Sequence, residues 1–152
     1  MMLSLRGADE RFFDACERVL GLRPPTAPNT TAIAADGVIF WLAPDEWLYH
    51  GEQMVTVTDL RAALDGLHSA VVDVSASRKT IVVAGERAEE VMAKAATLDF
   101  TLRGFPVGAC AQTNIARTQG LIHRRGASEF VVYVRGSYER YLRAWLADAA
   151  RD

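Results

Sequence analysis

Four side chains that could take part in a reaction lie within fifteen residues of one another in the C-terminal third of the sequence: Cys110, Gln112, His123 and Arg124. Cys110 and His123 are the best nucleophile–base candidates, because a hairpin over this stretch would bring a thiol and an imidazole together. Cys110, however, stands among small residues in GACA, a setting typical of a packed strand. We therefore predict a structural role for Cys110 and Gln112, with His123, Arg124 and Arg125 on a polar outgoing arm. No catalytic residue is assigned.

Metal and cofactor chemistry find little support in the sequence. His50, His68 and His123 are isolated, whereas structural zinc draws its ligands from close Cys/His pairs. The signatures GxGxxG, P-loop, HExxH and GxSxG are absent. Asp73 lies between two valines, and the polar face of a half-exposed strand explains it. We expect no metal ion and no cofactor on this chain.

Composition indicates a soluble globular protein. The chain has 152 residues, a net charge of −2 and 50% hydrophobic residues, without an apolar run long enough to span a membrane. Cys16 and Cys110 fit a reducing compartment. These features predict a single cytoplasmic domain over residues 1–152, with no affinity for nucleic acid or membranes.

The charge is distributed unevenly along the chain. Residues 1–100 carry nine basic and fifteen acidic side chains, and residues 101–152 carry eight arginines and four acidic side chains. Arginine pairs well with carboxylates on a partner, although an ordinary solvated face is the simpler explanation of the pattern. The anchors that we expect at a partner surface are Arg124, Arg125, Tyr133, Arg135 and Trp145.

Short strands joined by tight turns alternate with amphipathic helices. We expect strands at 2–7, 31–43 with a turn at Asp36-Gly37, 46–51, 69–85 with a polar turn, 109–125 with a turn, and 128–136. Helices are predicted from Asp9 to Gly21, at 58–67, at 88–95, and after a Ser137 cap, where apolar residues from Tyr138 to Ala149 form one stripe. This order favours the α+β class with a largely antiparallel sheet.

The strand at 128–136 is apolar on both faces. Such a strand is either covered on both sides by its own chain or offers one face to a partner. The sequence leaves these two alternatives open.

Several segments resemble the gamma subunit of heterotetrameric sarcosine oxidase. They include WLAPDEWLYH, FPVGACAQTNIAR and SEFVVYVRGSYERYLRAWLADAA, and the resemblance runs from about residue 3 to residue 150. That family is in turn similar to the folate-binding region of glycine-cleavage aminomethyltransferases, which implies an α+β domain of that kind.

The resemblance implies a non-catalytic subunit for assembly and structure. The family's complex demethylates sarcosine oxidatively to glycine and passes the one-carbon unit to tetrahydrofolate. Its FAD, FMN, NAD and tetrahydrofolate are implied on other subunits, and the implied partners are the alpha subunit and, through it, the beta and delta subunits. The aminomethyltransferase kinship also permits a stand-alone folate-binding or one-carbon-transfer protein, and a bare scaffold dimer is a third possibility.

Overall fold

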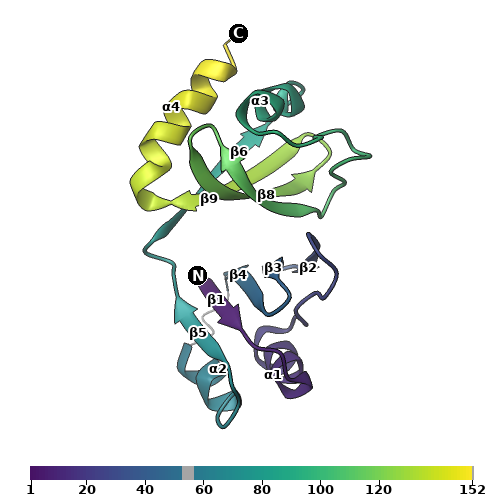
Figure 1. Cartoon of the computed structure of the whole chain (residues 1–152), viewed down its shortest axis with the longest axis vertical. Helices are drawn as coiled ribbons and strands as arrows, with labels where there is room; N and C mark the ends of the chain where they lie inside the picture. Colours follow the sequence, from purple (N-terminus) through teal and green to yellow (C-terminus); the bar gives the residue numbers. More distant parts are fainter. Residues whose placement is uncertain (53–56, 152) are drawn as a thin grey trace. The chain divides into compact units, whose positions relative to one another are not determined.

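The computed structural model describes residues 1–52 and 57–151. The chain divides into two compact units, Met1–Ser75 and Ala76–Asp152. Each unit has its own antiparallel sheet, helices and apolar core (Figure 1). The predicted α+β class and the antiparallel pairing are confirmed, and the strands form two sheets where one was expected. The single domain expected over residues 1–152 stays a prediction, which the cooperativity of unfolding would test.

Unit 1 contains a five-stranded sheet in the order β2-β3-β4-β1-β5. Its elements are β1 (Met2–Arg6), α1 (Glu10–Leu20), β2 (Thr31–Ala34), β3 (Gly37–Ala43), β4 (Glu46–Gly51), α2 (Val57–Ala63) and β5 (Ala70–Asp73). Helix α1 begins after Asp9, whose carboxylate accepts a hydrogen bond from the backbone N–H of Arg11. It ends at Gly21 in the left-handed region, with φ of 72°. Both predicted ends of this helix are confirmed.

Trp47 lies at the centre of the unit 1 core and is 0% exposed. Its ring lies 5.5 Å from the ring of Phe12 and 5.4 Å from that of Phe13, measured between centroids. Its Nε1 donates a hydrogen bond to the carbonyl of Pro25 at 2.7 Å. Trp47, a side chain of β4, therefore contacts both α1 and the proline-rich segment that follows α1.

The hairpin of β2 and β3 differs from the sequence prediction. Its loop residues are Ala35 and Asp36, and Gly37 is the first residue of β3, paired with Ala34. The φ of Gly37 is not positive. A Cβ at this position would lie 3.0 Å from the ring of Tyr49. The predicted hairpin is confirmed, but its turn lies at Ala35-Asp36 and not at Asp36-Gly37, and the glycine lies close to an aromatic ring of the neighbouring strand.

Unit 2 contains a four-stranded sheet in the order β6-β9-β8-β7. Its elements are β6 (Arg78–Ala84), α3 (Ala88–Ala95), β7 (Cys110–Ile115), β8 (Thr118–Gly126), β9 (Glu129–Arg135), the short 3-10 helix η1 (Gly136–Tyr138) and α4 (Glu139–Ala149). Helices α3 and α4 lie on the same face of this sheet (Figure 1). They bury Met92 and Leu142 against Ile122 and Val132 of the sheet.

Two expectations about unit 2 are wrong. Strands β5 and β6 do not pair with each other, because β5 joins β1 in unit 1 and β6 joins β9 in unit 2. Ser137 does not cap α4, because the turn of η1 precedes the helix and Tyr138 takes the cap position without a side-chain bond. Of the predicted stripe, Leu142, Leu146 and Ala149 are buried, whereas Tyr138 is 45% and Tyr141 40% exposed.

Within the described parts of the chain, no helix combines the length and the apolar character that crossing a membrane requires.

Candidate functional site

The hairpin of β7 and β8 places Cys110 and His123 directly opposite each other. They are register partners, so their side chains share one face of the sheet. Both are interior residues, with Cys110 0% and His123 3% exposed. The exposed polar position predicted for His123 is therefore wrong.

The surroundings of His123 weaken it as a catalytic base. Burial lowers its pKa to about 4, the positive charge of Arg125 adds to this effect, and Glu129 opposes it. A general base works best with a pKa near the operating pH, and a thiol without access to solvent is inert. The structure brings the nucleophile–base candidates together, and their environment favours packing over catalysis.

Arg124 is an interior residue, which corrects its predicted place on an exposed arm. Its guanidinium donates hydrogen bonds to the carbonyls of Phe100 and Phe105 at 2.5 and 3.0 Å, and its side chain is 0% exposed. It also bonds the carbonyl of Ala127 and the carboxylate of Glu89. Arg124 therefore holds the segment between α3 and β7 in place through these hydrogen bonds. Because its side chain is not exposed, it is not available for contact with a partner chain.

The same guanidinium stacks on an aromatic ring. Its Cζ lies 4.9 Å from the ring centroid of Phe130, and the ring of Phe130 meets that of Phe100 edge to face at 5.5 Å. The positive charge of Arg124 is thus stabilised by one partly exposed carboxylate, by carbonyl dipoles and by the face of an aromatic ring. No sequence pattern marks this cluster, because Phe100, Phe105 and Glu89 are 24, 19 and 35 residues away from Arg124.

The other predicted interface residues have different surroundings. Arg125 and Arg135 are exposed, Trp145 is half-buried, and Tyr133 is 2% exposed. Burial raises the pKa of Tyr133. All residues from Phe130 to Val134 are buried. Phe130, Val132 and Val134 belong to the core that α3 and α4 cover, and whether a partner covers the other face of β9 stays open. Arg125, Arg135 and Trp145 are the members of the predicted set that a partner can reach.

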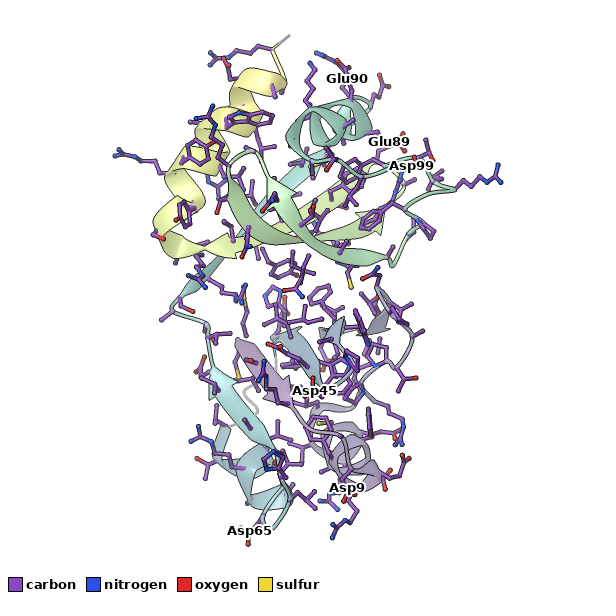
Figure 2. The ribbon with its side chains drawn as sticks, in the orientation of Figure 1. Asp9, Asp45, Asp65, Glu89, Glu90 and Asp99 are labelled. Carbon is purple, nitrogen blue, oxygen red and sulfur yellow. The ribbon has the colours of Figure 1, made fainter. Side chains whose placement is uncertain are left out.

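The acidic residues of unit 1 that Figure 2 labels, Asp9, Asp45 and Asp65, lie at separate places. Asp73 accepts hydrogen bonds from the backbone N–H and hydroxyl of Ser75, which lower its pKa. Glu90 pairs with Arg87 and Lys94, and these bonds lower its pKa to about 2. Glu89 instead pairs with Arg124. Across residues 1–52 and 57–151, no group of three or more His, Cys, Asp or Glu side chains lies together as metal ligands would.

The first turn of α3 is a poor phosphate site. It follows Gly85, as the loops of phosphate-binding helices follow glycines, yet Glu89 and Glu90 occupy that turn. Their carboxylates disfavour a second anion at the positive end of the helix.

One surface feature was not predicted from the sequence. A groove of about 310 Å³ runs beside the edge strand β6, between α3 and α4. Its lining is mostly apolar and comes from Ile81–Ala84, Arg87, Ala88, Val91, Arg143, Leu146, Ala147 and Ala150. Periodicity identified the buried faces of α3 and α4 but not the space left between the two helices.

The two antiparallel sheets and their helices define a class of fold. They do not define an activity, because no catalytic cluster is assembled among the described residues. The glycine cleavage system aminomethyltransferase T of Bartonella henselae has a similar fold, with a TM-score of 0.70 at 12% identity. The match covers 99% of this chain and 44% of that chain. At this identity the comparison shows the fold alone, and it confirms the predicted aminomethyltransferase-like architecture.

The family is shown by sequence. The profile of the sarcosine oxidase, gamma subunit family matches residues 6–152, and the chain belongs to this family. The sarcosine oxidase subunit gamma of an Arthrobacter species is 32% identical over 140 residues, which are 91% of this chain and 69% of that relative. The subunit gamma of Corynebacterium sp. strain P-1 is 30% identical over 92% of this chain and 70% of its own length.

A solved structure agrees with this assignment. The heterotetrameric sarcosine oxidase of Corynebacterium sp. U-96, in complex with pyrrole 2-carboxylate, contains a chain similar to this one. The TM-score is 0.91 at 28% identity, and the match covers 97% of this chain and 77% of that chain. The resemblance inferred from the sequence is confirmed.

Proposed function

We propose that this chain is a non-catalytic subunit of a flavin-dependent sarcosine oxidase complex. In such a complex sarcosine is demethylated oxidatively to glycine, and the one-carbon unit passes to tetrahydrofolate. The observation that carries the proposal is membership of the gamma subunit family over residues 6–152. The buried and divergent chemical groups of the candidate site are consistent with a role in assembly.

The partners in this proposal are an alpha subunit and, through it, beta and delta subunits. FAD, FMN, NAD and tetrahydrofolate belong to those subunits. Arg125, Arg135 and Trp145 are the candidate contacts, because they are at least partly exposed and belong to types that are enriched at interfaces.

The test is purification of the tagged chain from its native host. We expect larger flavoprotein subunits to co-purify in fixed stoichiometry and to carry all the flavin absorbance. Recovery of the chain by itself from cells that oxidise sarcosine would contradict the proposal.

A stand-alone folate-binding or one-carbon-transfer protein is the second candidate. The observation in its favour is the fold shared with aminomethyltransferase T. Calorimetric titration of the isolated chain with tetrahydrofolate separates the two functions. Saturable micromolar binding by the isolated chain favours the second candidate, and the absence of heat favours the first.

A further inference from the structure

The groove beside β6 has the features of a site for an added strand. Strand β6 is at the edge of its sheet, with β9 as its one neighbour in the order β6-β9-β8-β7. An edge strand presents backbone N–H and C=O groups that can pair with another extended segment. The groove lies against this edge, on the side where α3 and α4 pack.

The register shows which backbone groups point outward. The N–H of Gly136 bonds the carbonyl of Ser77, and the N–H of Gly85 bonds that of Ser128, so odd-numbered positions of β6 face β9. Because antiparallel partners alternate between bonded and non-bonded pairs, Thr80 and Val82 direct their N–H and C=O groups away from β9. A side-chain bond from Arg143 to the carbonyl of Thr80 confirms this direction.

The groove supplies the second part of such a site. Val82, on the outer edge, is 51% exposed. Next to it the groove is floored by Ile81 and Val83 and walled by small or apolar residues of α3 and α4. Its volume of about 310 Å³ is at the lower end of the range for ligand clefts, and so suits a few side chains better than a cofactor. Alternate side chains of a strand paired with β6 would point into it.

Charge identifies the chemistry of the occupant. The charged residues of the lining are Arg87 and Arg143, and no acidic residue lines the groove. They are 49% and 56% exposed, and each also contacts a glutamate of its own helix region, Glu90 or Glu139. Guanidinium groups at the edge of an apolar groove favour a segment that carries carboxylates.

We propose that the edge of β6 and its groove bind an extended segment of a partner subunit, one with small apolar side chains and at least one carboxylate. The segment adds a fifth strand to the sheet of unit 2. Backbone hydrogen bonds at Val82 give affinity, and the groove between α3 and α4 selects the side chains. This inference rests on the proposed assembly with other subunits and names the surface used.

The test compares two substitutions on one helix. Ala147 and Ala144 are both exposed residues of α4, but Ala147 lines the groove and Ala144 does not. Ala147→Arg fills the groove, and Ala144→Arg makes the same change of helix propensity and charge outside it. When the full-length variants are co-expressed with the other subunits, we expect Ala147→Arg to weaken assembly at least tenfold and Ala144→Arg to stay within twofold of the parent.

A second variant and a direct readout examine the edge itself. Val82→Pro removes an outward N–H and leaves the bonds to β9 in place, as proline on a solvent-facing edge does. We expect it to lower assembly without loss of the isolated chain's thermal stability. Hydrogen exchange at the outward amides of Thr80, Val82 and Ala84 is expected to be fast in the isolated chain and at least tenfold slower in the complex.

The possible results distinguish an error in the assigned β6 surface from an error in the proposed function. If the parent chain assembles but Ala147→Arg assembles equally well and the amides of Thr80, Val82 and Ala84 gain no protection, the surface is assigned wrongly and the function stands. If the parent chain does not assemble, both are wrong. If Ala147→Arg abolishes self-association of the isolated chain and not assembly, the occupant is a second copy, which also overturns the inference.

Discussion

Two neighbouring arginines, one inside unit 2 and one at its surface, give a matched pair of substitutions. Arg124 is 0% exposed and bonds three carbonyls and Glu89, whereas Arg125 is 52% exposed and pairs with Glu129. Arg124→Ala leaves the carbonyls of Phe100, Phe105 and Ala127 without their charged donor and opens a space over Phe130. Arg125→Ala removes one surface ion pair and leaves the core as it is.

The expected magnitudes differ clearly. A buried carbonyl that is left without its hydrogen-bond donor costs about 1–3 kcal/mol, and Arg124→Ala leaves three carbonyls in this state. Surface ion pairs contribute about 0–1 kcal/mol. Arg124→Lys keeps the charge but offers its donors from one nitrogen instead of a planar fork, so we expect it to recover only part of the loss.

The assay is equilibrium unfolding in urea, followed by tryptophan fluorescence and by circular dichroism. Free energies of unfolding come from linear extrapolation for the parent chain and the three variants. We expect Arg124→Ala to be the least stable, Arg124→Lys intermediate, and Arg125→Ala within about 1 kcal/mol of the parent. Equal stability of Arg124→Ala and Arg125→Ala would refute the assignment of Arg124 as the residue that holds the connection between α3 and β7.

Three further predictions concern single residues. The pKa of His123 in the folded chain, about 4, is below that of an unfolded histidine, so its contribution to the free energy of unfolding is fully present above about pH 6.5 and is lost as the pH falls toward 4. Urea titrations at pH 7.5, 5.5 and 4.5 should show that the free energy of unfolding decreases with falling pH. The same decrease in the His123→Leu variant would contradict this prediction. Trp47→Ala should lower the free energy of unfolding by about 3–5 kcal/mol, since the indole is fully buried, and an unchanged urea midpoint would show that it is not a core residue. Cys110→Ala and Cys110→Ser should leave sarcosine oxidation by the assembled complex largely intact, and a loss beyond about a hundredfold with the fold preserved would identify the thiol as a nucleophile.

Local signals predicted those parts of the fold that depend on neighbouring residues. Asp9 and Gly21 mark the ends of α1 because cap and stop residues act within one turn. Apolar spacing identified the buried face of α3, from Ala88 to Ala95. The hairpin of β7 and β8 was also predicted correctly, and it brought Cys110 and His123 together.

Tertiary contacts decided the features that the sequence prediction missed. From its sequence context Gly37 is predicted as a turn residue, but it lies in a strand, close to the ring of Tyr49 from another strand. Arg124 reads as a surface charge, because its acceptors at Phe100, Phe105 and Ala127 are not adjacent to it in sequence. The groove beside β6 depends on the spacing of two helices, which no local pattern encodes.

Reconstitution from separately expressed subunits tests the central claim most directly. The other subunits are mixed with and without this chain, and sarcosine-dependent oxygen consumption is measured together with the mass of the complex by light scattering. We predict that the isolated chain is colourless and inactive, joins the complex in fixed stoichiometry, and is needed for full activity or stability. Oxidation of sarcosine by this chain alone, or a fully active and stable complex without it, would contradict the account.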